Sequence, residues 1–145
     1  MPTQSEIAAE LFNSGFNCAQ SVAAAFSEKY GLPQSMALNV ASGFGGGVRC
    51  GEICGAVTGA AMIIGLKYGQ TRADDKAAKS KCNAETVEFT TRFRSLNNSV
   101  VCRDILGYDI STPEGQEKAK TKNLFSTTCV DMVTSAVRIL EDMGY

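Results

Sequence analysis

The amino-acid sequence of 145 residues predicts an all-α fold, a single-domain bundle of several helices that spans residues 1–145. Apolar residues recur at intervals of three and four through most of the chain, which is the spacing of one face of a helix. Helix-capping residues precede several of these stretches, whereas no Asn-Gly hairpin signal and no alternating strand pattern occurs. A segment from about residue 51 to residue 68 is apolar nearly all round, which is typical of a buried central helix.

The N-terminal part of the chain predicts three helices. Thr3-Gln-Ser-Glu6 is a capping box, and the helix that it begins ends at Gly15. Asn17 is positioned to cap a second helix with Cys18 in its first turn. Pro33 stands at the start of a third, short helix that leads into a glycine-rich turn. The glycines of this turn and of the next helix, which allow backbones to approach closely, are Gly43, Gly45, Gly46, Gly47, Gly51, Gly55 and Gly59.

The C-terminal part predicts a long polar helix, a brief helix and a final apolar-faced helix. The long helix opens at residues 71–74 and ends at residues 97–98. Its inner stripe consists of Cys82, Thr86, Phe89, Phe93 and Leu96. The brief helix holds Cys102 in its first turn, and the final helix begins near residues 126–128 with Cys129 close to its start.

Composition excludes several classes of function. The net charge is −1 and both signs are mixed along the chain, so nucleic acid is not an expected partner. No secretory signal and no apolar run long enough to cross a bilayer occurs, so we expect no membrane association and a cytoplasmic protein. Histidine is absent, which excludes mixed Cys/His zinc sites, haem held by a proximal histidine and Cys-His catalytic pairs.

Six cysteines in a chain without a secretory signal favour metal or redox chemistry over a disulfide framework. Cys82 falls in the middle of a predicted helix and is interpreted as a small buried apolar residue. The other five fall at predicted helix starts and are the candidate site residues: Cys18, Cys50, Cys54, Cys102 and Cys129. Free amides and the helix dipole stabilise an anion there, so these thiols are expected to have lowered pKa values.

Cys50 and Cys54 form a C-x3-C pair, which on a regular helix places both sulfurs on one face. That arrangement suits two ligands of one metal or cluster. In dithiol chemistry Cys54 would attack the substrate, and Cys18 or Cys50 would be the resolving thiol. Arg49 would further stabilise the Cys50 thiolate if its side chain points inward. The glycine-rich turn also permits a phosphate ligand, although it lacks the dinucleotide and P-loop motifs.

Several segments together resemble the C_GCAxxG_C_C family of redox-active proteins. They are Asn17-Cys18-Ala-Gln-Ser, Gly43-Phe-Gly-Gly-Gly, Cys50-Gly-Glu-Ile-Cys54-Gly-Ala-Val-Thr-Gly-Ala, Cys102-Arg-Asp-Ile-Leu-Gly and Cys129. The resemblance implies that Cys18 is the first cysteine of the pattern, that Cys54 belongs to its central block, and that Cys102 and Cys129 are its last two. It implies redox activity in a group of bacterial and archaeal proteins often found in anaerobes, without a known substrate.

The resemblance extends to a domain of split-Soret cytochromes, but this chain has no haem-attachment motif, so no haem is expected. The leading hypothesis is a redox protein, either an oxidoreductase or an electron carrier with an unknown redox partner. It would use a reversible dithiol or an iron–sulfur cluster held by Cys18, Cys50, Cys54, Cys102 and Cys129. The alternative is a non-catalytic domain that binds zinc or is metal-free. A homodimer formed through the small residues of the central helix is a further expectation.

Overall fold

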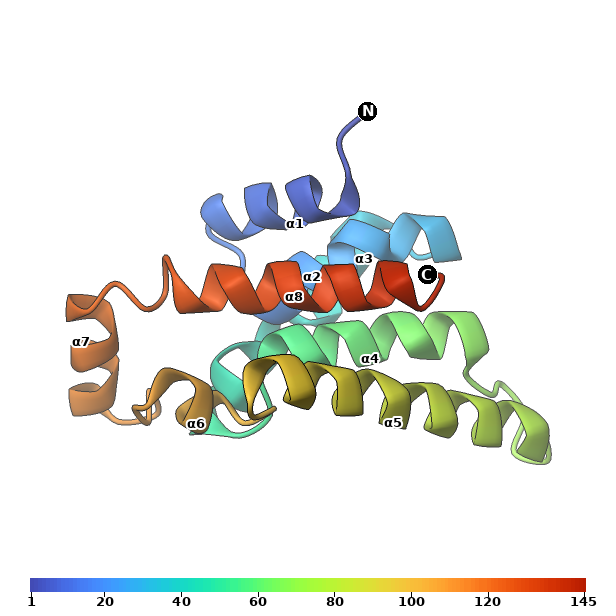
Figure 1. The fold of residues 1–145 in the computed structure, drawn as a ribbon. Coiled ribbons are helices and arrows are strands. Elements are labelled where there is room, and N and C mark those ends of the chain that lie inside the picture. The colour runs from blue at the N-terminus through green and yellow to red at the C-terminus, as the bar shows by residue number, and fades with distance from the viewer.

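A computed structural model, which describes residues 1–145, confirms the all-α fold (Figure 1). The α-helices are α1 (Gln4–Asn13), α2 (Cys18–Ser27), α3 (Gln34–Val40), α4 (Gly55–Tyr68), α5 (Lys76–Asn97), α6 (Cys102–Leu106), α7 (Pro113–Thr121) and α8 (Thr128–Asp142). The β-structure is limited to one isolated antiparallel bridge, between Ile53 and Val101. None of the helices combines the length and the apolar character needed to span a bilayer.

Helix α4 is the centre of the bundle, as the sequence predicts. It packs against α2, α5 and α8, and Figure 1 shows it between α5 and α8. Ile63 and Ile64 of α4 are fully buried, and so are Phe26 of α2 and Phe89 and Phe93 of α5. Burial of each such side chain contributes about 1.5–3 kcal/mol, so this layer supplies much of the stability of the fold.

Two helix starts match their predicted caps. The Thr3 hydroxyl accepts a hydrogen bond from the Glu6 amide, and the Asn17 side chain accepts one from the Gln20 amide, with the reciprocal bonds also present. Other boundaries differ. Helix α5 begins at Lys76, after the Asp75 cap, because residues 71–74 form a turn. Its predicted inner stripe is buried at Phe89 and Phe93 but exposed at Leu96.

Helices α2 and α4 approach each other closely at Gly59. A Cβ atom at this position would lie 2.6 Å from the Ala19 carbonyl oxygen and 3.2 Å from the Val22 Cβ. Gly55, one turn earlier, has the same role: a Cβ there would lie 3.1 Å from the Cys18 Cβ. The two glycines therefore let the first turns of α2 and α4 lie against each other.

The prediction that the central helix starts at residue 51 or 52 is wrong. Gly46, Gly47, Val48 and Arg49 all have positive φ angles, between 58° and 64°, and form a left-handed turn. The following residues are extended because their backbone pairs with the segment before α6: the Cys54 amide donates to the Val100 carbonyl at 2.8 Å. Helix α4 therefore starts at Gly55, with Cys54 as its N-cap residue.

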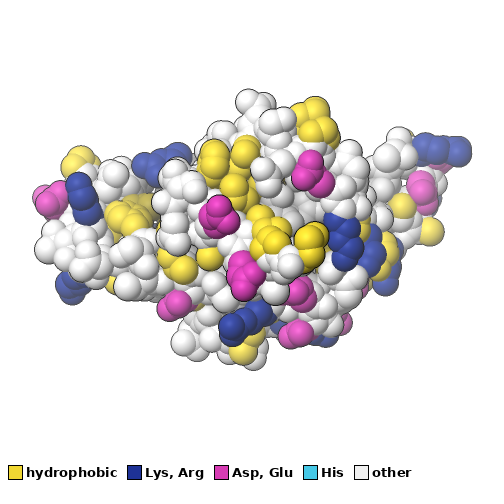
Figure 2. Space-filling model, turned by 90° about the horizontal axis from the view of Figure 1, so that it is seen from above, with side chains coloured by type: hydrophobic (Ala, Val, Ile, Leu, Met, Phe, Trp, Pro, Cys, Tyr) yellow, Lys and Arg dark blue, Asp and Glu magenta, His cyan; other side chains and the backbone are white.

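Charged residues are spread over the surface. In the view of Figure 2, acidic and basic side chains both occur among apolar ones, and no extended area of this face carries a single sign. The ion pairs on the surface join residues close in sequence, except for Arg103 Nη1 and Glu52 Oε1, which are 2.6 Å apart. This pair links the start of α6 to the extended segment before α4.

Candidate functional site

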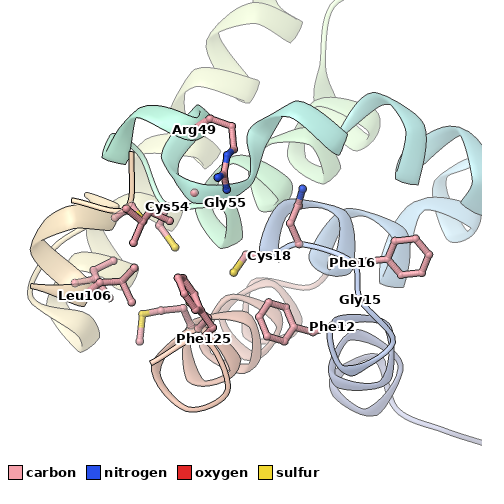
Figure 3. A pocket seen from close by; sticks show the side chains of 16 residues that line it. Phe12, Gly15, Phe16, Cys18, Arg49, Cys54, Gly55, Leu106 and Phe125 are labelled. Carbon is pink, nitrogen blue, oxygen red and sulfur yellow. The ribbon is translucent and has the colours of Figure 1, made fainter. Parts of the chain in front are cut away.

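Four of the six cysteines line one cavity of about 210 Å³ (Figure 3). Cys18 is the first residue of α2, Cys54 is the N-cap of α4, Cys102 is the first residue of α6, and Cys129 is the second residue of α8. The predicted helix-start positions of these four cysteines are thus confirmed. They come from segments far apart in the sequence, which meet at one end of the bundle near α6 and the start of α8 (Figure 1).

Backbone contacts bring the cysteine-bearing segments together. The bridge between Ile53 and Val101 is flanked by two hydrogen bonds, of which one runs from the Cys102 amide to the Glu52 carbonyl at 2.6 Å. This pairing sets Cys54 beside Cys102. The close contact of α2 and α4 at Gly55 and Gly59 brings Cys18 to the same place, and α8 packs against α2 and adds Cys129.

The cavity is mainly apolar. Its apolar walls come from Phe12, Phe16, Ile105, Leu106, Ile110, Phe125 and Met132. Arg49 is its only charged lining residue, and neither Asp nor Glu lines it. In Figure 3 the guanidinium nitrogens of Arg49 point toward the side of the cavity where Cys18 and Gly55 lie. The thiols are therefore surrounded by an environment of low polarity with one positive group.

Cys18 and Cys129 interact as a pair. The neighbouring Cys129 thiol raises the pKa of Cys18 well above its ordinary value, and burial raises it further. The Cys18 thiol in turn lowers the pKa of Cys129, because it stabilises the Cys129 thiolate, while burial opposes this effect. All six cysteines are free thiols. Of the pocket thiols, Cys129 is thus the one that ionises most readily.

The expectation of lowered pKa values at every helix-start thiol is wrong for three of them. Burial raises the pKa of Cys54 to about 11, although the amides of Ala56 and Val57 oppose it. Burial, with the neighbouring Cys54, raises the pKa of Cys102 to about 12. A helix dipole contributes about 0.3–1 kcal/mol, less than one pKa unit, whereas burial shifts a pKa by up to about 3–5 units. Burial therefore prevails at Cys54 and Cys102, whereas the neighbouring Cys129 has the larger effect on Cys18.

Cys50 does not join the other four. It is exposed, it does not line the cavity, and its thiol donates to the Gly47 carbonyl at 3.3 Å. The prediction that Cys50 and Cys54 share one helix face is wrong, because the left-handed turn and the extended segment separate them. Cys82 lies in the middle of α5, as expected, where it is half-buried against the main core.

The apolar walls and the orientation of Arg49 were not identified from the sequence. Phe12 belongs to a helical apolar stripe, and nothing in that pattern separates a cavity wall from a core residue. The position of Arg49 next to a cysteine was the only signal that it could lie near the site. Its orientation depends on positive φ angles at Val48 and Arg49, which non-glycine residues rarely adopt.

The opposite pKa shifts predict that the pocket thiols react with iodoacetamide over different pH ranges. The thiolate is the reactive form, so a lowered pKa extends the reactivity of Cys129 to lower pH than that of free cysteine. Cys54 and Cys102 should stay unmodified until the pH approaches their raised values of about 11 and about 12. Peptide mass spectrometry after alkylation at a series of pH values measures each site separately.

Unfolding the chain in urea is the control for this experiment, since it should bring the sites to one common pH dependence. A common midpoint for all four thiols in the folded protein would contradict the electrostatics described above.

The donors at the cavity are suited to soft metals. Four thiols, without a histidine or a carboxylate among the lining residues, match the ligands of iron–sulfur clusters and of zinc sites built from four cysteines. In the structure, no three Cys, Asp or Glu side chains stand close enough together to hold one metal ion. A cluster or ion would be held by Cys18, Cys54, Cys102 and Cys129 after adjustment of their side chains.

Comparison with known proteins identifies one family. The family model described as "Putative redox-active protein (C_GCAxxG_C_C)" matches residues 16–143. The matched region contains all four cysteines of the cavity and Arg49. No curated protein and no solved structure matches the chain.

Proposed function

The chain belongs to the C_GCAxxG_C_C family of redox-active proteins, and from this membership and the thiol cavity we propose that Cys18 and Cys129 work as a reversible dithiol–disulfide pair. The placement of both thiols at one cavity, where each shifts the pKa of the other, is the observation that carries the proposal. One thiol of the pair is readily ionised, as the attacking group of thiol–disulfide exchange must be, and the other lines the same cavity and can resolve the mixed disulfide once it has lost its proton. A reducing compartment such as the cytoplasm would keep the pair reduced between reactions.

The exchange proceeds in two steps. The Cys129 thiolate attacks one sulfur of a substrate disulfide, so that a mixed disulfide forms and the other half leaves as a thiolate. The Cys18 thiol then gives up its proton to that leaving thiolate and attacks the Cys129 sulfur. This second step forms the Cys18–Cys129 disulfide and releases the remaining half of the substrate as a thiolate. The substrate gains two electrons, the protein loses two, and a thiol reductant would restore the pair.

The assignment of the attacking role to Cys129 differs from the sequence-based expectation, which gave it to Cys54. The pKa of Cys54 is about 11, so a very small fraction of this thiol is ionised near neutral pH. Cys54 and Cys102 are both buried, with about 6–7% of their surfaces exposed. In the proposed exchange they surround the pair without reacting.

A second candidate follows from the number of thiols at the cavity. Four cysteines around one apolar space are the donor set of an iron–sulfur cluster. Such a cluster would supply one-electron transfer when bound. The residues of the chain would contribute four thiolate ligands, and the apolar walls, including Phe12 and Phe125, would limit access of water and so influence the reduction potential.

Anaerobic purification followed by iron, zinc and thiol analysis tests these candidates, in a Cys50→Ser background that removes the exposed thiol. For the dithiol we expect one equivalent of a small disulfide to remove two thiols, and peptide mapping to find the Cys18–Cys129 disulfide. Iron with visible charge-transfer absorption would favour the cluster. An unchanged thiol count without iron would overturn both, and zinc in that sample would support the non-catalytic alternative.

A further inference from the structure

The charge of Arg49 is not neutralised within the chain. Arg49 has no ion pair and no hydrogen-bonded partner among the side chains of the protein. Arg103, by contrast, pairs with Glu52. It is also exposed, although it lines the cavity. The guanidinium therefore stands at the boundary between the thiol cavity and solvent, where it is free to bind an incoming anion.

The backbone holds Arg49 in this place by an uncommon conformation. Val48 and Arg49 have φ angles of 59° and 58°, a left-handed conformation that β-branched and long side chains rarely adopt. The turn is closed by a hydrogen bond of 3.1 Å from the Glu52 amide to the Gly47 carbonyl. Strained conformations of this kind persist where the surrounding structure imposes them, and they are concentrated at functional sites.

Gly46 leaves space for the guanidinium. A Cβ atom at Gly46 would lie 2.9 Å from Arg49 Nη1 and 3.0 Å from the Cδ1 atom of Ile110. The Arg49 side chain thus folds back across its own turn and presents its nitrogens toward the cavity, as Figure 3 shows. The turn positions one cation beside four thiols, with no acidic side chain among the lining residues to neutralise it.

A ligand that fits this cavity has two parts. Its charged part should be an anion with planar geometry, because a guanidinium binds a carboxylate through two parallel hydrogen bonds. The part that lies in the cavity should be apolar and polarisable, because Phe12, Phe125 and Met132 line the cavity, and a second charged end would remain in solvent.

We propose that the cavity takes a small organic disulfide that carries a carboxylate, with the carboxylate on Arg49 and the disulfide facing Cys129. This inference rests on the proposed thiol–disulfide exchange and names its substrate class. In the exchange, the substrate S–S bond breaks, the Cys18–Cys129 bond forms, and two thiol-carboxylates are released. Two electrons pass from the protein to the substrate.

Three disulfides that differ only in their end groups test this assignment: dithiodipropionate is anionic, hydroxyethyl disulfide is neutral and cystamine is cationic. The rate of loss of the Cys18 and Cys129 thiols is measured for each, with the full chain carrying Cys50→Ser. We expect the rates to fall in that order. Arg49→Gln should slow the reaction of dithiodipropionate about tenfold more than that of the neutral disulfide, which is the effect of losing one charged hydrogen-bonded contact.

Arg103→Gln is the matched control, since it removes the same charge near the site from a residue outside the cavity, and it should preserve the preference for the anionic disulfide. Arg49→Lys should retain part of the preference, because the charge remains while the planar group is lost. The comparison of the three disulfides on the protein with its native Arg49 needs no variant at that position, so misfolding of a variant does not prevent the test.

The outcomes separate this inference from the proposed function. Equal rates for all three disulfides, after correction for their intrinsic reactivity toward free cysteine, would overturn the role of Arg49 and leave the exchange intact. Equal slowing of the anionic and neutral disulfides by Arg49→Gln would also overturn it, since Arg49 would then act on the thiols instead of the substrate. Failure of every disulfide to oxidise the pair would overturn the proposed function itself.

Discussion

Replacing Cys129 with serine is expected to slow oxidation of the protein by hydroxyethyl disulfide by at least about tenfold. The remaining pocket thiols all have raised pKa values. At pH 7 a thiol with a pKa of about 11, such as Cys54, is ionised in only about one molecule in 10⁴. A thiolate with a higher pKa is also more nucleophilic, and this recovers part of the lost rate. The logarithm of its rate constant rises by about half of the difference in pKa.

The measurement is the rate of thiol loss in the Cys50→Ser background. Cys82→Ser is the matched control, because Cys82 lies outside the cavity on α5, and its replacement should leave the rate unchanged. Cys18→Ser should behave differently from Cys129→Ser: a mixed disulfide should form on Cys129 and then persist. Unchanged oxidation of Cys129→Ser, or a first mixed disulfide on Cys54, would contradict the assigned roles.

Replacing Gly59 with alanine is expected to lower the free energy of unfolding by about 1–3 kcal/mol. The new Cβ would lie 2.6 Å from the Ala19 carbonyl oxygen, and backbone cannot move aside as a flexible side chain does. Helices α2 and α4 would have to separate. Alanine favours a helix over glycine by about 1 kcal/mol, and this gain offsets only part of the cost.

Gly65→Ala is the matched control in the same helix. No atom lies within 4 Å of a Cβ at Gly65, so this substitution should raise the free energy of unfolding by up to about 1 kcal/mol. Urea unfolding under reducing conditions measures both variants. Equal changes in the free energy of unfolding at Gly59 and Gly65 would show that helix propensity alone determines the effect of alanine. The close contact of α2 and α4 would then contribute nothing to the cost at Gly59.

The extent to which the fold follows from the sequence depends on the range of the interactions. The N-caps at Thr3 and Asn17 depend on residues three positions apart, and both are present as predicted. The start of α4 depends on pairing with residues near Val101, almost fifty positions later, and the predicted start was wrong. Local signals can place a cap, but they cannot show that a distant segment will bind the backbone.

The same distinction applies to the site. Helix starts were visible in the sequence at Cys18, Cys102 and Cys129, and the structure brings these cysteines together with Cys54. Their pKa values do not follow from the sequence, because desolvation depends on the whole surrounding structure and the mutual effect of Cys18 and Cys129 joins opposite ends of the chain. A regular helix through this segment would place Cys50 beside Cys54, but the left-handed turn interrupts the helix and separates them.

The location of Cys18 near one end of the chain and Cys129 near the other links oxidation to folding. A bond between them would close a loop of about 110 residues, and in the chain-entropy model such a crosslink stabilises a fold by about 4–5 kcal/mol. Folding and disulfide formation make up a closed thermodynamic cycle, so folding stabilises the disulfide by the same free energy. This corresponds to a reduction potential about 100 mV lower in the folded protein than in the unfolded chain. The oxidised form would resist unfolding more strongly, and the cell's proteases would remove the reduced form first.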